Sequence, residues 1–473
     1  MLFGLCVVVF VVAANAQEPS KPDAPGPDPA AATGSVAGQQ PGAGAQVRTG
    51  SAIGDGELTL ANRLAILLSD HQFLEMEKVL KAQQDAPEGA SKLTPEQAQL
   101  YKGILANRMN QPEESVRLLE PLVAKIRSAD HPPEEKILRK ALAEDYLRMG
   151  DWARANQAYL EYEYRVGGGL SQDEKDELEL PVKLLPLARE NPPMTVEPGE
   201  AFSLPYDRDP LGLTDIPVFV DARSHDWMLD PTLPFNLICR TTAKEVGLTV
   251  SEAAVTIHTL TGRPMQVHVT MIPRLTLGTV TYRNMTAFVF EDADYYFPGT
   301  GYQVRGVLGY PAVSALGSIT VTAGARIEVE PGEKGERLTT GARFFLDGDQ
   351  VIAALGKPDA ERMFAIDAGG QQTYLTARYY AEHTAEFADR KAELQKVPGA
   401  LGRAPVFVPD LVTLQVGETA ISLQFPQVLT QPLGDAAFDD IYGKLGMDAL
   451  DELRSYTFDY RTMRFAVRNQ QYR

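Results

Sequence analysis

The sequence predicts a multidomain α + β protein, in which a helical, repeat-like region precedes two all-β lobes that form an internal pseudo-dimer. Residues 58–189 carry apolar side chains at spacings of three and four, which is typical of packed helices. After Phe202 the apolar residues alternate with period two, which is typical of strands. The β region also repeats itself, since the stretch ending at Asp230 has a later counterpart ending at Asp367. A chain of 473 residues is long enough for about three domains.

The N-terminus predicts an export signal at residues 1–16. An apolar run at residues 2–14 is too short to span a bilayer as a helix, and Ala14-Asn15-Ala16 gives the small-x-small pattern of a cleavage site. No Lys or Arg precedes the run, so the alternative is a short membrane anchor that is not removed. Residues 17–56, rich in Pro, Gly and Ala, predict a disordered leader. We therefore expect a secreted or periplasmic protein.

Composition excludes some classes of function. The net charge of −18 argues against a nucleic-acid partner, because phosphate binding needs clustered Lys and Arg. Cys239 is the only cysteine after the predicted signal, so no internal disulfide is expected there. The six histidines show no metal-ligand spacing, and no phosphate-binding loop or Gly-x-Ser-x-Gly elbow occurs. The sequence therefore predicts no metal and no cofactor.

Residues 57–190 are expected to form the helical domain. Two segments resemble tetratricopeptide helix pairs, one around Gly103 and Asn110 and the other around Gly150 and Tyr159. Their spacing, measured from Asn110 to Gly150, is longer than the usual period of about 34 residues. A last helix is expected at residues 173–189, before Asn191-Pro192-Pro193 ends the domain.

The two β lobes are expected at residues 200–335 and 340–473. Strands are predicted at residues 218–220, 256–258, 267–269, 285–290 and 319–321 in the first lobe, and at 413–416 and 457–459 in the second. In each lobe a glycine that follows leucine comes after the aspartate, and the interval from Asp230 to Gly309 equals the interval from Asp367 to Gly446. A short helix is expected after each of these Leu-Gly pairs, at residues 312–316 and 449–453. The repeat suggests chemistry by two acids, Asp230 and Asp367, across a pseudo-twofold axis.

These motifs resemble the bacterial retropepsin-like aspartic peptidases in their tandem two-lobe form. In that family an apolar strand ends in Asp-Thr/Ser-Gly, and a later hydrophobic-hydrophobic-Gly motif runs into a helix. Val307-Leu308-Gly309 is similar to the later motif, and Lys444-Leu445-Gly446 is similar but has lysine first. The resemblance covers about residues 200–473, and the helical region fits the tetratricopeptide-like region of some members. It implies two acid-protease lobes, peptide hydrolysis by an aspartate pair, and a peptide or protein substrate.

The aspartate motifs depart from the family pattern. The first lobe has Asp230-Pro231-Thr232, and the second has Asp367-Ala368-Gly369. Pro231 and Ala368 lack the hydroxyl that joins the two loops in the family. Pro231 also lacks an N–H and restricts the backbone, and Thr232 adds a β-carbon where the family has glycine. These changes predict a damaged loop in the first lobe and a nearly intact one in the second, where Gly369 is kept.

The sequence leaves three interpretations open. The first is an aspartic peptidase homologue with catalytic Asp230 and Asp367, and with Gly369, Gly309 and Gly446 as supporting, substrate-binding residues. The second is a pseudopeptidase that binds peptide without cutting it, with a further protein-binding surface on the helical domain. The third makes the lobes a scaffold for the helices. An aromatic run at Tyr295-Tyr296-Phe297 is interpreted as a hydrophobic turn, with the lining of a cleft as the alternative.

Overall fold

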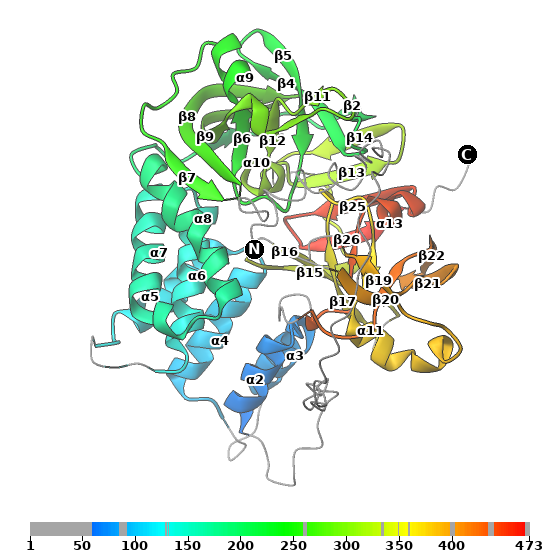
Figure 1. Ribbon diagram of the computed structural model, residues 1–473. Helices are drawn as coiled ribbons and strands as arrows, with labels where there is room; N and C mark the ends of the chain where they lie inside the picture. Colours follow the sequence, from blue (N-terminus) through cyan, green and yellow to red (C-terminus); the bar gives the residue numbers. More distant parts are fainter. Residues whose placement is uncertain are drawn as a thin grey trace, which may run out of the picture.

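The computed structural model describes residues 59–84, 92–127, 130, 132–258, 263–332, 335–348, 350–357, 360–397, 403–433 and 439–468. The predicted signal peptide and leader lie outside these residues. A helical region, a first β lobe and a second β lobe follow one another along the chain and pack side by side (Figure 1). Among the described helices, none combines the length and apolar character needed to cross a bilayer.

The helical region consists of antiparallel neighbours. Its helices are α2 (Leu60–Ser69), α3 (Phe73–Gln84), α4 (Pro95–Arg108), α5 (Pro112–Val123), α6 (Glu135–Arg148), α7 (Trp152–Val166) and α8 (Gln172–Ala188), with a 3-10 turn η1 (Gly167–Gly169) before α8. The first and last residues of α6 follow those of α4 by the same number of positions, and α7 begins that same number of positions after α5. Gly103 allows the close packing of α4 on α5, because a β-carbon there would lie 2.4 Å from Leu119 Cδ2. The predicted last helix is α8, which begins at a capping box of Ser171 and Glu174.

The first lobe is built around a closed barrel. Its strands are β1 (Thr195–Glu197), β2 (Phe202–Pro205), β3 (Asp207–Arg208), β4 (Thr214–Val220), β5 (Arg223–Leu229), β6 (Asn236–Cys239), β7 (Val255–His258), β8 (Pro264–Leu277), β9 (Val280–Phe290), β10 (Tyr296–Phe297), β11 (Tyr302–Gln303), β12 (Gly306–Leu308), β13 (Ser318–Thr322) and β14 (Arg326–Glu330). Its helices are α9 (Arg240–Glu245), η2 (Asp292–Asp294) and α10 (Tyr310–Ser314). Six strands pair in the ring β9-β6-β12-β5-β4-β8, which the β8–β9 pairing closes. Because β1 pairs with β9, strand pairing in this lobe begins before the expected boundary at residue 200.

The second lobe resembles the first in the order of its elements. They are β15 (Ala342–Asp347), β16 (Gln350–Leu355), β17 (Arg362–Ile366), β18 (Tyr374–Leu375), α11 (Ala377–Glu382), η3 (Thr384–Phe387), β19 (Glu393–Lys396), β20 (Arg403–Phe407), β21 (Leu411–Val416), β22 (Thr419–Gln424), β23 (Gln427–Leu429), β24 (Gly443–Leu445), α13 (Met447–Glu452), β25 (Ser455–Asp459) and β26 (Arg464–Val467). A single shift in residue number, the one that relates Asp230 to Asp367, carries the bounds of α9, β12 and β13 onto those of α11, β24 and β25. The barrel is open here, because the described strands β21 and β22 form a separate hairpin. The short helices after the two Leu-Gly pairs are α10 and α13, and both begin two residues earlier than expected.

A sheet shared by the two lobes joins them. Within the longest sheet, the order β15-β26-β25-β13-β14-β2 sets strands of the second lobe beside strands of the first. The central pair, β13 and β25, is antiparallel, and its register places Thr320 opposite Thr457, its equivalent in the repeat. The two hydroxyl oxygens are 2.8 Å apart in a buried hydrogen bond. The middle of the shared sheet is therefore a pair of equivalent residues.

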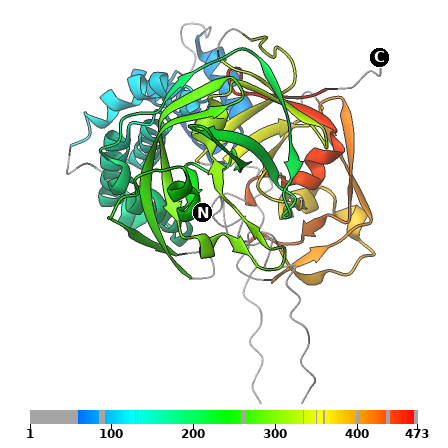
Figure 2. The same cartoon turned by 90° about the horizontal axis from the view of Figure 1, so that it is seen from above.

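The helical region contacts both lobes. Helix α8 packs on β7 and β8 of the first lobe, and α4 packs on β15 of the second. Seen from above, the helices lie along one side of the molecule and the second lobe lies at the other (Figure 2). Asp347, the last residue of β15, forms an ion pair with Arg108 Nη2 at 2.8 Å and also lies 2.8 Å from His71 Nε2. This cluster, in which Arg108 is buried and Asp347 is partly buried, attaches the helices to the second lobe.

Candidate active site

Asp230 follows β5, where the strand pairs in parallel with β12. Its backbone N–H donates to the Leu308 carbonyl at 3.0 Å, which fixes the residue beside the Val307-Leu308-Gly309 segment. The backbone N–H of Thr232 donates to Asp230 Oδ1 at 2.9 Å, and the Thr232 hydroxyl donates to the same oxygen at 2.6 Å. Thr232 thus supplies both a backbone donor and a hydroxyl donor to this carboxylate, next to Pro231, which has no N–H.

Asp367 has the same backbone position in the second lobe but different partners. It follows β17, and its N–H donates to the Leu445 carbonyl at 2.9 Å. Asp367 Oδ2 lies 2.8 Å from Lys444 Nζ, in an ion pair in which the Lys444 side chain is 14% exposed and that of Asp367 is 8% exposed. Asp367 Oδ1 has no hydrogen-bond partner among the described residues. The loop expected to be nearly intact thus presents a carboxylate held by an ammonium group.

The two aspartate loops meet. A β-carbon built on Gly369 would lie 3.0 Å from Asp230 Oδ2, so the second loop closely approaches the carboxylate of the first. Over the whole residue, Asp230 is 1% exposed and Asp367 is 6% exposed. Gln371, two residues beyond Gly369, also donates its side-chain amide to the Leu211 carbonyl of the first lobe. Residues far apart in sequence thus form one buried acidic centre at the junction of the lobes.

Burial and charge shift the proton affinity of this centre. Burial raises the pKa of Asp230 to about 6, and the nearby Asp367 carboxylate also raises it, whereas the Thr232 hydrogen bonds and Lys444 lower it. The free oxygen of Asp230, Oδ2, is buried without a hydrogen-bond partner among the described residues. A carboxyl group in this setting holds a proton in mildly acidic solution and can give it to a bound molecule.

Gly309 and Gly446 lie behind the aspartates, enclosed by backbone of their own lobes. A β-carbon on Gly309 would lie 2.1 Å from the Phe235 carbonyl oxygen, and one on Gly446 would lie 2.8 Å from the Gln372 carbonyl carbon. The Gly309 N–H donates to Asn236 Oδ1, and the Gly446 N–H donates to Thr373 Oγ1, both at 3.0 Å. These contacts let the glycines shape the loops, while their contact with substrate stays a prediction.

Other candidates from the sequence lie elsewhere. Tyr295 and Phe297 are buried and Tyr296 is exposed, and the Tyr295 ring lies 4.1 Å from that of Phe290. Tyr296 and Phe297 form β10, so part of the aromatic run is a strand where a turn was expected. Cys239 is buried and caps α9. No group of His, Cys, Asp or Glu able to hold a metal ion occurs among the described residues.

The role of Lys444 was missed by sequence reasoning. Lysine at this position counts only as a weaker match to the family motif, and Val307 occupies the equivalent position in the first lobe. The signal available was a charged residue within an otherwise apolar motif, directly after Gly443 on a strand parallel to β17. Strand pairing carries Lys444 to the aspartate, which the spacing alone did not reveal.

Comparison with known proteins bears on the first lobe. A family model described as aspartyl protease matches residues 216–312, a span that contains Asp230 and the Val307-Leu308-Gly309 segment. A solved retropepsin-like aspartic protease from Rickettsia conorii matches 27% of this chain and 98% of its own, at 15% identity and a TM-score of 0.22. No curated protein matches the chain. The family match supports a relationship to aspartic proteases.

Proposed function

We propose that the chain is a peptidase of the aspartic type, which binds an extended peptide between its two lobes and hydrolyses it with Asp230 and Asp367. The observation that carries this proposal is the close approach of Gly369 to the Asp230 carboxylate, since Gly369 lies two residues after Asp367 in the loop of the second acid. The aspartyl protease match over residues 216–312 supports it.

The reaction needs two carboxyl groups that share one proton. One carboxylate takes a proton from water as the water oxygen attacks the peptide carbonyl, and the other carboxyl gives its proton to the carbonyl oxygen. Asp230 Oδ2 and Asp367 Oδ1 are the oxygens free for these transfers among the described residues. The remaining oxygens are held by Thr232 and Lys444, which orients both groups.

We also propose that the two lobes are halves of an internal pseudo-dimer. The same shift in residue number relates β12 to β24 and β13 to β25, which supports this arrangement. So does the shared sheet, whose centre pairs Thr320 with Thr457. A twofold axis through that pair would relate the two aspartate loops.

The proposal is tested by incubating the purified protein with a mixed peptide library from about pH 3 to pH 8. Cleavage is expected, with losses of at least about 100-fold in both Asp230→Asn and Asp367→Asn, because acid-base catalysis requires both groups. Asp226→Asn is the matched control, since Asp226 is an exposed aspartate on β5, the strand that leads to Asp230. Cleavage that survives either active-site change refutes the shared mechanism.

The second candidate is a pseudopeptidase that holds a peptide without cutting it. Lys444 favours it, because an ammonium group on Asp367 competes with water for that carboxylate. Pro231 and Ala368 favour it too, since neither offers a hydroxyl to join the loops. In this case peptides recovered from the library bind the protein, and mass spectrometry finds them intact at every pH.

For the helical region we propose a tetratricopeptide-like arrangement that docks a protein partner. The constant shift that relates α4 to α6 and the start of α5 to that of α7 supports it. A pocket between α6, α7 and α8 and both lobes, lined by Tyr159, Phe235 and Leu346 among others, offers a place for contact. Cross-linking that recovers partners on the lobes alone would count against this assignment.

We further propose that the chain is exported, on the basis of residues 1–16. N-terminal sequencing of protein from the periplasm or medium is then expected to begin at Gln17. Recovery of the intact N-terminus from a membrane fraction would instead indicate an anchor.

A further inference from the structure

The two halves of the acidic centre differ most at one pair of equivalent positions, Val307 and Lys444. Each belongs to the strand that precedes the Leu-Gly glycine of its lobe, β12 in the first and β24 in the second. Val307 is buried in the hydrophobic core. Lys444 instead directs its ammonium group to Asp367 Oδ2 at 2.8 Å. The second lobe therefore carries a positive charge at a position where the first lobe is apolar.

Each carboxyl group has one oxygen held and one oxygen free. Asp230 Oδ1 is held by two neutral donors, the backbone N–H and the hydroxyl of Thr232. Asp367 Oδ2 is held by the charged donor Lys444. Asp230 Oδ2 and Asp367 Oδ1 are both buried without hydrogen-bond partners among the described residues. The groups thus meet in different electrostatic surroundings, although their backbones are equivalent.

We propose that Lys444 is a positioning residue that keeps Asp367 ionised, so that Asp230 carries the single proton of the pair. The proposal rests on the proposed peptidase function and assigns a separate role to each acid. An ammonium group in contact with a carboxylate stabilises the ionised form far more than neutral donors do. Surroundings that separate two titratable groups in this way define which is the acid and which is the base.

The proton movements balance with these roles. Asp367 Oδ1 takes a proton from water while the water oxygen bonds to the peptide carbonyl carbon, and Asp230 Oδ2 gives its proton to the carbonyl oxygen. The tetrahedral product then breaks its C–N bond as Asp367 returns the first proton to the leaving nitrogen. One hydroxyl of the tetrahedral product gives its proton to Asp230, which leaves a carboxylic acid, an amine and the starting protonation state.

Charge and burial agree with the assignment. Among the described residues, the charged and titratable groups that act on Asp230 include Asp367, Lys444 and the phenol of Tyr460. Burial, with Asp367, raises the pKa of Asp230 to about 6, despite the opposing effects of Thr232 and Lys444. Burial also raises the pKa of Tyr460 well above its ordinary value, so this phenol is neutral in the same range.

The test is a pH titration of protonated carboxyl groups by infrared difference spectroscopy, which does not depend on activity. In the unchanged protein one carbonyl band of a buried carboxylic acid is expected to titrate with a midpoint near the pKa of Asp230, about 6. The band is expected to disappear in Asp230→Asn and to remain in Asp367→Asn. A band that disappears only in Asp367→Asn overturns the assignment.

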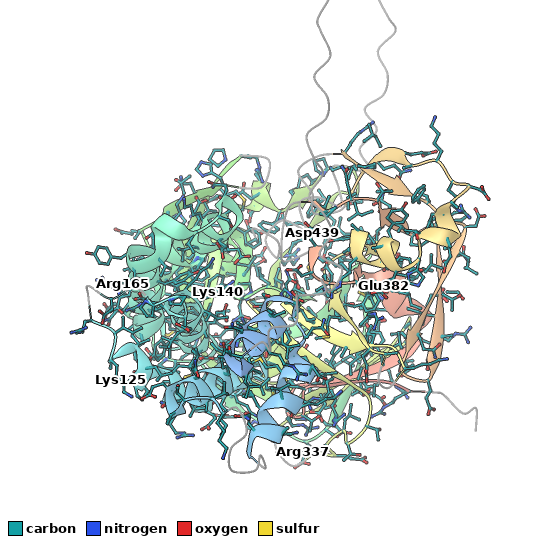
Figure 3. The ribbon with its side chains drawn as sticks, turned by 90° about the horizontal axis from the view of Figure 1, so that it is seen from below. Lys125, Lys140, Arg165, Arg337, Glu382 and Asp439 are labelled. Carbon is teal, nitrogen blue, oxygen red and sulfur yellow. The ribbon has the colours of Figure 1, made fainter. Side chains whose placement is uncertain are left out.

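Variants of Lys444 separate its charge from its bulk. Lys444→Met keeps an unbranched chain and removes the charge, so the Asp230 midpoint is expected to rise by about one pH unit. Lys444→Arg keeps the charge and is expected to shift the midpoint by less than about half a unit. Lys125→Met is the control, since Lys125 is exposed and lies on the helical side of the molecule (Figure 3). A midpoint unmoved in Lys444→Met, or moved equally in Lys444→Arg, refutes the role of the ammonium charge.

Cleavage adds a second readout. If the protein cleaves peptides, kcat/KM is expected to fall as pH rises through the Asp230 midpoint, because the acid must be protonated. In Lys444→Met this fall in kcat/KM is expected at a higher pH, displaced by the same number of pH units as the midpoint of the infrared band. If no variant cleaves but the band follows the pattern above, the peptidase function fails while the charge assignment stands. If the protein cleaves peptides and the pH at which kcat/KM falls is unchanged in Lys444→Met, the role of Lys444 is refuted while the peptidase function stands.

Discussion

Thr232 and Lys444 determine how the two aspartates differ. Both occupy positions where the family motif has other residues, and both bind a carboxylate oxygen directly. Thr232 compensates for the missing glycine, because any residue other than proline has a backbone N–H and threonine adds a hydroxyl. Asp230 nevertheless remains a buried acid that has one oxygen without a partner among the described residues. The site therefore contains a carboxyl group, Asp230, whose burial destabilises the fold when it is ionised and which can donate a proton.

Replacing Asp230 by asparagine is expected to stabilise the protein at neutral pH. The folded-state pKa, about 6, lies above the ordinary value of 3.8, so the folded form binds more protons between these values. The stability that Asp230 contributes therefore falls as pH rises through this window, by about 3 kcal/mol in total. Asparagine removes the charge and keeps an acceptor for Thr232.

Thermal unfolding of both proteins across pH measures this effect. The melting temperatures are expected to agree near pH 4 and to separate in favour of Asp230→Asn above about pH 6. Asp226→Asn, at an exposed site on β5, serves as the control. A constant difference across the whole range contradicts the assigned proton affinity.

At the scale of elements, each acid is positioned by an equivalent strand-loop-helix arrangement in its own lobe. In each, a strand that leads into the aspartate pairs in parallel with the strand that precedes Gly309 or Gly446. The helix that follows begins by donating to the aspartate loop, from Tyr310 N–H to Leu233 at 2.7 Å and from Met447 N–H to Gly370 at 2.8 Å. Strand, loop and helix are thus held together by backbone hydrogen bonds, which require close approach rather than particular side chains.

Gly309→Ala is expected to destabilise the first lobe by about 3 kcal/mol, because its β-carbon would meet the Phe235 carbonyl and force the backbone apart. Chemical denaturation measures the loss. Gly299→Ala in the same lobe is the control, since no atom lies within 4 Å of its added β-carbon, and it is expected to change stability by less than about 0.5 kcal/mol. Equal effects of the two changes would contradict the enclosed position of Gly309.

The helical region and the lobes form one assembly at the scale of the whole molecule. Arg108 is buried and joins Asp347 of the second lobe, at 2.8 Å, to Glu144 of α6, at 3.2 Å. Burial alone would raise the pKa of Asp347, but its ion pairs outweigh burial, and the pKa lies well below the ordinary value. The stability from Asp347 is therefore present above its ordinary value of 3.8 and is lost as pH falls below it.

Arg108→Met is expected to cost about 3–5 kcal/mol, because it leaves the buried Glu144 and the partly buried Asp347 without their shared cation. Limited proteolysis is expected to release the helical region from the lobes in this variant, and thermal unfolding measures the loss. Arg117→Met is the control, since Arg117 forms an exposed pair with Glu114 and its loss is expected to cost less than about 1 kcal/mol. Resistance to proteolysis equal to that of the unchanged protein would show that the cluster does not hold the helices.

Much of the architecture could be read from the chain before any coordinates: the order of helical and β regions, the internal repeat of the β region, and the candidate pair Asp230 and Asp367. Periodicity and internal repetition are local properties, so they are visible without knowing how distant segments pack. The helix at residues 172–188 and the strands β9 and β13, expected at residues 285–290 and 319–321, follow from such patterns.

Three contacts became visible only in the folded chain: Thr232 completes the first loop, Lys444 pairs with the second aspartate, and Arg108 fastens the helices to Asp347. Spacing assigns residues to equivalent positions, but the partner of a buried charge depends on side-chain direction and on strands joined across the fold. Opposite charges that are buried together offset part of each other's desolvation penalty. Tertiary packing therefore determines which of the many possible charge pairs form.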